Sequence, residues 1–502
     1  MKKVIVVGAG IAGLAAGIYA QKSGFGVTIC EAHSRPGGNC TGWRRGGYFF
    51  EGSMHWLNGS SPHSAVNRLW RETGALSDTS HIIKHDPFLT SDCNGQQACL
   101  YRDVDKFEQH LCDLSPEDTS QVKRMCADLR RFTAVDIPVT DIFGLKVREK
   151  APSLLKTGIK MLPAALRMGE LGKISAKEYA NRFHSPAIRL LLLNTVNPGY
   201  DAVSLFFTMA HFLSGDGGYV EGGTVNMVQN MVKRFTDSGG LIRYNTRVER
   251  IIVEGGQAIG ISACGSTIPA DAVIVTADTL VVVASPDSGG IFSPPLRDTW
   301  LKKIQKNTQL IINTFLCLGV ETDLSALPAN IAFSLEKPFE FNGQTLDYLA
   351  CRNYASYPGY APEGCSALTI KISGDSYDYW VLARKQGLYE QRKEELFETV
   401  LEKLETRFPV IKGKTRVHDI ATPLTYEKYC GTYRGSWMTQ TPPGKHRRLP
   451  YPCKPKSVKN LYFAGQRILL PGGLPAVVVT GRRAAQYLCR DFGMVFGSDL
   501  AR

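Results

Sequence analysis

The stretch Val4-Ile-Val-Val-Gly-Ala-Gly-Ile-Ala-Gly13 decides the fold that this sequence predicts. Its first four residues are an unbroken β-branched run, which is typical of a buried parallel strand. Three glycines follow in G-x-G-x-x-G spacing, and the alanine-rich residues 14–21 predict a helix. In such a unit Gly8 permits a tight turn, Gly10 lets the backbone approach a pyrophosphate, and Gly13 lets the helix pack on the strand. We therefore predict a dinucleotide-binding unit.

An acidic residue completes this unit. A second strand is predicted over residues 26–30, and it ends at Glu31, 18 positions after Gly13. A carboxylate at this place accepts hydrogen bonds from an adenosine ribose, and it favours a ribose without a 2′-phosphate. Glycines in this spacing also occur in ordinary turns. The succession of strand, glycines, helix, second strand and acid favours nucleotide binding over an ordinary turn.

The composition is that of a large globular protein. The chain has 502 residues, of which 43% are hydrophobic and 21% charged, so it can bury a substantial core. The formal net charge is +13. Such a balance suits nucleic acid, an anionic membrane surface or solubility alone. No zinc-finger or RNA-recognition signature accompanies it, so we expect no nucleic-acid partner.

Cysteine usage and hydropathy bear on the compartment. The 13 cysteines are scattered, and none forms a C-x-x-C pair, so we expect free thiols, a reducing cytoplasm and no metal site. Lys2 and Lys3 followed by an apolar run resemble a signal peptide, but that run is the predicted first strand. No run reaches the ~18 apolar residues that a membrane span needs. We expect a cytoplasmic protein, with peripheral membrane contact left open.

The middle of the chain predicts helices, over residues 121–132, 153–172 and 175–193, with Ser115 as the cap that starts the first. Residues 153–172 mix apolar and basic side chains. That pattern suits a membrane contact or the lip of a lipid tunnel, and it equally suits a helix packed on the protein with a solvated basic face.

The strand–glycine–helix pattern returns twice. Glycine-rich residues 217–223 precede a predicted helix over 225–238 and a buried strand over 270–277. The chain closes with a strand near 460–465, a second glycine turn and a helix that starts near Leu474. The nucleotide-binding domain is therefore predicted to assemble from three separated segments.

The residues after Glu31 indicate which dinucleotide is bound. The segment Arg35-Pro-Gly-Gly38 and the segment 47–52 resemble those of flavoproteins with two dinucleotide-binding domains. That resemblance implies that the first segment continues the phosphate site and that the second approaches the flavin ring. The cofactor is therefore predicted to be FAD and not NAD. The helix near Leu474 would direct its N-terminus at the flavin pyrimidine edge.

We predict an α/β fold with a discontinuous FAD-binding Rossmann-type domain and an inserted α+β substrate domain. The FAD-binding domain is assigned to residues 1–85, 217–298 and 456–502. The substrate-binding domain is assigned to residues 86–216 and 299–455, and its helical part is the candidate for membrane contact.

The ordered set of motifs resembles the phytoene desaturase-like flavoproteins, which include carotenoid desaturases, carotenoid isomerases and retinol saturases. The resemblance rests on residues 8–31, 36–38, 222–223, 239–240, 461–465 and 471–473. It implies an FAD-dependent oxidoreductase that acts on carbon–carbon bonds of a long apolar polyene or isoprenoid lipid. The chemistry implied is desaturation, saturation or isomerisation by hydride transfer at flavin N5. A separate quinone, oxygen or reductase would donate or accept electrons.

The resemblance also implies a set of cofactor-binding residues. Asn39 and Gln466 depart from the usual pattern of the family, but both lie within this set. The predicted set is Gly8, Gly10, Ile11, Ala12, Gly13, Glu31, Ala32, Arg35, Gly37, Gly38, Asn39, Gly52, Ser53, Met54, His55, Arg247, Val248, Thr276, Ala277, Gly465, Gln466, Gly473, Leu474, Pro475 and Val478.

Three residues are candidates for proton transfer, namely His55, Glu51 and Tyr433. For His55 the alternative is a structural histidine, and for Glu51 it is an acceptor of ribityl or backbone hydrogen bonds. Two other functions share this fold. One is a flavin amine oxidase, and the other is a non-catalytic prenyl-protein-binding module that lacks FAD. The intact glycines and Glu31 argue against the second.

Overall fold

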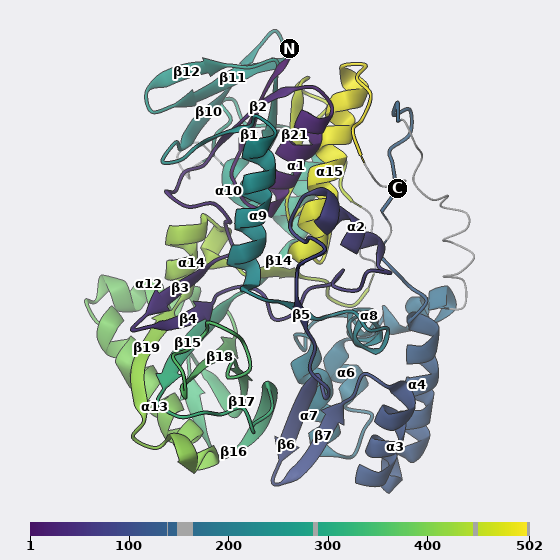
Figure 1. Ribbon diagram of the computed structural model, residues 1–502, viewed down its shortest axis with the longest axis vertical. Helices are drawn as coiled ribbons and strands as arrows, with labels where there is room; N and C mark the ends of the chain where they lie inside the picture. The colour runs from purple at the N-terminus through teal and green to yellow at the C-terminus, as the bar shows by residue number, and fades with distance from the viewer. Residues whose placement is uncertain (138, 148–163, 285–289, 445–449, 499–502) are drawn as a thin grey trace.

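The computed structural model describes residues 1–137, 139–147, 164–284, 290–444 and 450–498. Most of the helix predicted over 153–172 lies outside these residues, and only its last part, from Ala164, is described as helical. The predicted fold class, an α/β flavoprotein fold with a Rossmann-type domain, is confirmed. Figure 1 shows the part that is predicted to bind the nucleotide at the top, with a large sheet and a helical region below it.

A parallel five-stranded sheet forms the centre of the upper part. Its strand order is β21-β13-β1-β2-β9. The strands come from three distant segments of the chain, and each is three to five residues long. They are β1 (Lys3–Val7), β2 (Gly26–Cys30), β9 (Leu241–Arg243), β13 (Ala272–Val275) and β21 (Leu461–Phe463).

Helices cover one face of this sheet, and a β-meander covers the other (Figure 1). On the helical face, Val4, Val6 and Ile274 pack against three helices, which are α1 (Ile11–Lys22), α9 (Gly223–Asp237) and α15 (Gly473–Asp491). On the other face, Ile5 and Val273 pack against a three-stranded sheet in which β11 (Gln257–Ala263) pairs with both β10 (Val248–Glu254) and β12 (Ser266–Pro269). Both faces are therefore dry, as a parallel sheet requires.

A mixed seven-stranded sheet organises the lower part, in the order β19-β15-β18-β17-β16-β6-β7. Its strands are β6 (Leu89–Cys93), β7 (Gln96–Leu100), β15 (Asn313–Val320), β16 (Asn330–Phe341), β17 (Gln344–Asn353), β18 (Ser366–Ser373) and β19 (Thr415–Ala421). The helices α12 (Tyr377–Lys385) and α13 (Tyr389–Arg407) pack on one face, where alternate residues of β18 are apolar. The opposite face of β17 and β18 is left to the site described below.

The helical region lies beside β6 and β7 (Figure 1). It comprises α3 (Val104–Leu114), α4 (Thr119–Phe132), α6 (Ala176–Ala180), α7 (Pro186–Thr195) and α8 (Ala202–Leu213). The single helix predicted over 175–193 is wrong, because α6 and α7 are separate. The Ser185 hydroxyl accepts a hydrogen bond from Ile188 N, and Pro186 occupies the first turn, so a new helix starts there.

Ser115 stands at the predicted helix start, before a proline in the first turn, but its side chain does not make the expected capping bond. Its hydroxyl donates to a carboxylate oxygen of Asp118 (2.9 Å) and accepts no helix N–H. A short 3-10 turn, Pro116–Asp118, precedes α4 instead.

The remaining elements connect these parts. They are β3 (Gly42–Arg45), β4 (Tyr48–Glu51), α2 (Ala65–Glu72), β5 (Ile82–Ile83), β8 (Tyr219–Val220), α10 (Thr279–Val282), α11 (Thr299–Asn307), β14 (Gln309–Ile311), α14 (Pro423–Cys430) and β20 (Met438–Gln440), with 3-10 turns at Pro409–Ile411 and Tyr433–Gly435. The β3–β4 hairpin contacts β18 and β19, although the predicted boundaries place it in the FAD-binding domain.

Among the described residues no helix combines the length and apolarity needed to cross a membrane.

Candidate FAD and substrate site

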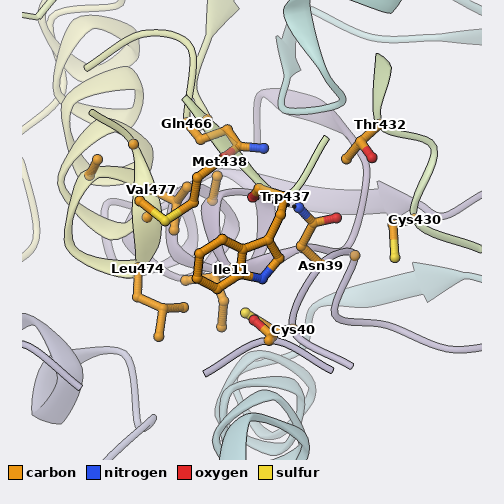
Figure 2. Close-up of a pocket in the computed structure, with 18 of the residues that line it drawn as sticks. Ile11, Asn39, Cys40, Cys430, Thr432, Trp437, Met438, Gln466, Leu474 and Val477 are labelled. Atoms are coloured by element: carbon orange, nitrogen blue, oxygen red, sulfur yellow. Dashed lines mark hydrogen bonds between the residues drawn. The ribbon is translucent and has the colours of Figure 1, made fainter. Parts of the chain in front are cut away.

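One large cavity lies between the two parts of the molecule. Its volume is about 2110 Å³, and its lining comes from the five-stranded sheet, the seven-stranded sheet and the helical region. Figure 2 shows one stretch of it, where the Trp437 indole projects between Ile11, Leu474 and Asn39. The site therefore draws on segments from nearly the whole chain.

Most of the predicted cofactor-binding residues line this cavity. Those that do are Gly8, Gly10, Ile11, Ala12, Glu31, Ala32, Arg35, Gly37, Gly38, Asn39, Ser53, Met54, His55, Arg247, Val248, Thr276, Ala277, Gly465, Gln466, Gly473, Leu474 and Pro475. Gly13, Gly52 and Val478 are not among the lining residues. Folding thus gathers residues from both ends and the middle of the sequence at one surface.

The glycine turn shows why small residues are needed beside the cavity. Gly8 has a φ of +102°, which side chains rarely adopt. A Cβ on Gly13 would lie 1.9 Å from the Gly8 carbonyl oxygen. Gly13 therefore serves the close packing of α1 on β1 and does not need to line the cavity. The first turn of α1 has no capping side chain, so its N–H groups are open to a ligand at Ile11 and Ala12.

Glu31 holds two neighbouring loops at the cavity edge. Its carboxylate accepts hydrogen bonds from Ala9 N (2.7 Å) and His33 N (2.9 Å). The Ala9 carbonyl in turn accepts from Gly37 N (2.9 Å). These bonds join the glycine turn to the Arg35–Gly38 segment, so the two parts of the predicted phosphate site are adjacent.

The cavity contains polar groups that suit a bound dinucleotide. Asn39 Oδ1 and Thr432 Oγ1 are buried and have no hydrogen-bond partner among the described residues. The helix α15 also starts without a side-chain cap, after Gly472, and its first residues line the cavity. Two uncapped helix N-termini, an acid at the position predicted to contact the ribose, and unpartnered polar atoms are features that suit FAD, so these residues fit that cofactor.

Aromatic side chains surround His55 in the middle of the cavity. The centroid of its ring lies 5.1 Å from that of Trp437, 6.2 Å from that of Trp56 and 6.3 Å from that of Phe315. Exclusion of bulk water lowers the pKa of His55 well below its usual value, and the charges of Arg352 and Lys371 lower it further. His55 is therefore neutral near pH 7 and holds no proton to give as a cationic acid.

Comparison with known proteins places the chain in a family. Residues 11–489 match the family described as flavin containing amine oxidoreductase. The chain belongs to this family. It is an FAD-dependent oxidoreductase, as predicted, and the resemblance to carotenoid enzymes is confirmed by the relatives that follow.

Two relatives of this flavin-dependent oxidoreductase cover almost all of it. The chloroplastic prolycopene isomerase of Daucus carota is 25% identical over 98% of this chain and 80% of its own length. The lycopene-forming phytoene desaturase of Pseudescherichia vulneris is 24% identical over 98% of this chain and its full length. In fold the chain is similar to the cyclohexylamine oxidase of Brevibacterium oxydans, with a TM-score of 0.61, 15% identity, and coverage of 98% of this chain and 99% of that one.

Two of the proton-transfer candidates in this oxidoreductase lie away from the cavity. Glu51 is buried behind the lining, where its carboxylate accepts from the backbone N–H and hydroxyl of Thr224 and from the Tyr219 hydroxyl. Tyr433 is 43% exposed, and its backbone N–H donates to Asp278 (3.1 Å). Neither lines the cavity, so the geometry argues against a direct role for either in proton transfer. Only His55 of the three reaches the reaction space.

Sequence reasoning missed several charged side chains that line the cavity. Arg467 forms a buried ion pair with Asp278, with two contacts of 2.8 and 3.1 Å. Arg352 of β17 and Lys371 of β18 face the cavity near His55. One signal was available, because residues 367–373 alternate as a strand and Lys371 falls on the face opposite the apolar positions.

Proposed function

We propose that this oxidoreductase acts on carbon–carbon bonds of a long apolar polyene or isoprenoid lipid, by desaturation, saturation or isomerisation. The observation that carries the proposal is the cavity, whose volume of about 2110 Å³ is roughly twice the upper end of ordinary ligand pockets. Beyond His55 it is lined by large apolar side chains, among them Trp56, Phe88, Val203 and Phe207. The named relatives, a prolycopene isomerase and a phytoene desaturase, support the same chemistry.

The chain's own residues would bind the cofactor and keep the site dry. In this proposal residues 1–85, 217–298 and 456–502 hold FAD, and residues 86–216 and 299–455 shape the substrate space. When bound, FAD supplies hydride transfer at its N5 atom. The predicted cofactor-binding residues that line the cavity hold FAD, with its pyrophosphate at the start of α1. Trp56 packs edge-on to Phe88 and Phe212, which excludes water from the substrate.

In this scheme His55 would line the reaction space as an uncharged side chain. Its ring is tilted by 33° to that of Trp437, and its backbone carbonyl accepts a hydrogen bond from Arg352. Both contacts fix where the ring stands. A neutral ring in a fixed place orients a substrate without delivering a proton.

The electron partner and the route of substrate entry extend this proposal. Since the sequence predicts no second nucleotide-binding unit, electrons would pass to or from a separate quinone, oxygen or reductase. Phe143 lines the cavity and is 96% exposed, and Leu166 is 79% exposed. Such side chains suit contact with a lipid surface, from which an apolar substrate would enter. Flotation with phosphatidylglycerol vesicles, comparing the wild type with Phe143→Ser, tests that contact.

A flavin amine oxidase is the alternative with this fold. Amine substrates are cations in neutral water, and binding of a cation is disfavoured beside like charges. The cavity carries Arg352 and Lys371 next to His55, and neither forms an ion pair among the described residues. The positive charge beside His55 therefore favours the polyene proposal over the amine oxidase.

Anaerobic mixing of the purified holoprotein with phytoene, prolycopene and putrescine tests the proposal. We expect a polyene to bleach the flavin absorbance and gain a double bond, or to change geometry or lose a double bond once the flavin is reduced. Mass spectrometry and chromatography report each product. Turnover of putrescine with release of peroxide, and no change in any polyene, would contradict the proposal and support the amine oxidase.

A further inference from the structure

Two basic side chains share one face of neighbouring strands inside the cavity. In the antiparallel register of β17 and β18, Arg352 is the partner of Thr369. Lys371 lies two residues beyond Thr369, so its side chain points to the same side of the sheet. Arg352, Thr369 and Lys371 all line the cavity, while Ile370 and Ile372 pack into the core behind them. The sheet thus presents a cationic surface toward the substrate space.

This pair has no negative partner among the described residues. Two other cations of the cavity do have such partners, since Arg467 pairs with Asp278 and Arg482 with Asp141 (2.8 Å). Arg352 is 8% exposed, and within the part of the chain that the structure describes its guanidinium donates one hydrogen bond, to the His55 carbonyl. The Lys371 ammonium makes no hydrogen bond or ion pair with any residue that the structure describes.

The electrostatics of Lys371 agree with this geometry. Removal from water lowers its pKa from 10.5 to about 8, and the only charge that acts on it appreciably, Arg352, lowers the pKa in the same direction. A carboxylate nearby would have the opposite effect. Lys371 is nevertheless protonated near pH 7, so the chain carries an uncompensated positive charge inside the cavity, which costs stability unless a ligand supplies an anion.

We propose that Arg352 and Lys371 bind an anionic end group, a carboxylate or a phosphate, on an otherwise apolar substrate chain. This inference rests on the proposed function, because it names the class of substrate that the same cavity accepts. The planar guanidinium of Arg352 suits two-point contact with an anionic oxygen group, and the ammonium of Lys371 adds a point charge. Anchoring one end of the chain fixes which carbon–carbon bond reaches the cofactor.

Titration of the FAD-loaded protein with dodecanoate, dodecyl phosphate and methyl dodecanoate tests the anionic site without any reactive polyene. Perturbation of the flavin absorbance reports binding. We expect the wild type to bind at least one of the two anions about tenfold or more tightly than the ester. The stronger of the two anions identifies the end group. In Lys371→Met the preference should fall to about twofold or less, and Lys371→Arg should retain most of it.

Controls separate loss of the site from loss of the fold. Lys233→Met removes an exposed lysine that is 75% accessible and pairs with Asp237 on α9, so it should leave the preference unchanged. If Lys371→Met fails to retain flavin, Arg352→Lys takes its place, because it keeps the positive charge. Arg352→Lys should weaken the preference for the anion over the ester by severalfold. Equal binding of the anions and the ester by the wild type would overturn the proposal.

The same titration distinguishes this proposal from the proposed function. A Lys371-dependent preference for an anion, with no polyene converted, would leave the anionic site standing and overturn the polyene chemistry. Conversion of a neutral polyene, with no preference for an anion over the ester, would leave the chemistry standing and overturn the anionic site.

Discussion

Glu51 and Thr224 are joined by two hydrogen bonds, although 173 residues separate them in the chain. The backbone N–H of Thr224 donates to one carboxylate oxygen (2.9 Å), and its hydroxyl donates to the other (2.7 Å). Ser53 N and Met54 N also donate to Glu51 (3.1 and 3.3 Å). The carboxylate therefore ties the end of β4 and the loop that carries His55 to the first turn of α9.

Replacement of Glu51 by alanine should lower the free energy of unfolding by about 3 kcal/mol, because it leaves several buried donors without an acceptor. Glu51→Gln keeps one acceptor oxygen and should lose less. Urea denaturation of the holoprotein, followed by circular dichroism, measures both. A stability unchanged within about 0.5 kcal/mol, together with lost activity, would instead point to a catalytic Glu51.

Replacement of Gly13 by alanine should displace α1 from β1 and release the cofactor. The added Cβ would lie 1.9 Å from the Gly8 carbonyl oxygen and 2.8 Å from Thr276 Oγ1, and backbone atoms there cannot give way cheaply. We expect a loss of most of the flavin absorbance per protein after gel filtration. Gly169→Ala is the matched control, since nothing lies within 4 Å of a Cβ at that position. Full flavin content in Gly13→Ala would contradict this account.

His55 should make the protein less stable in acid. Its pKa is held well below 6.5 in the folded state, so below about pH 6.5 the unfolded chain binds a proton that the folded chain does not. Stability is then lost as the pH falls. His55→Gln cannot take up this proton, so between pH 7.5 and pH 5 its free energy of unfolding should fall less steeply than that of the wild type. Parallel curves for the two proteins would show that His55 is protonated equally in both states.

Lys371 should have an effect of the same sign as that of His55, but at alkaline pH. The groups that face it are Arg352 of β17 and His55, and the pKa of the lysine is lowered from 10.5 to about 8. Between pH 8 and pH 10.5 the unfolded chain binds this proton more tightly than the folded chain does. The free energy of unfolding therefore rises with pH through this group, by up to about 3 kcal/mol.

Removal of the lysine should therefore stabilise the ligand-free fold near neutral pH. We expect Lys371→Met to raise the melting temperature at pH 7 and to lose this advantage above about pH 10. The exposed Lys233→Met should match the wild type throughout. A lower melting temperature of Lys371→Met at pH 7 would mean that the lysine is already compensated within the protein.

Local patterns were enough to predict the nucleotide-binding half. Residues 4–13 specify their own conformation, since the β-branched run, the positive φ of Gly8 and the contact at Gly13 all act within one strand–turn–helix unit. The position of Glu31 could also be predicted from the sequence, because the length of one helix and one strand sets its distance from the glycines. The helix break before Pro186 was missed because the apolar pattern continues through it.

The family and the cofactor class of this protein were thus determined by its sequence, because short motifs fix backbone geometry without help from distant residues. The positions of Glu51, Tyr433, Arg352 and Lys371 relative to the cavity were decided only by the tertiary structure. Whether a carboxylate faces a cavity or a distant helix, as Glu51 faces Thr224, depends on how strands far apart in sequence are brought together. The charge of a cavity likewise depends on the folded structure, because burial and neighbouring charges shift the pKa of each group away from the value typical of its residue type.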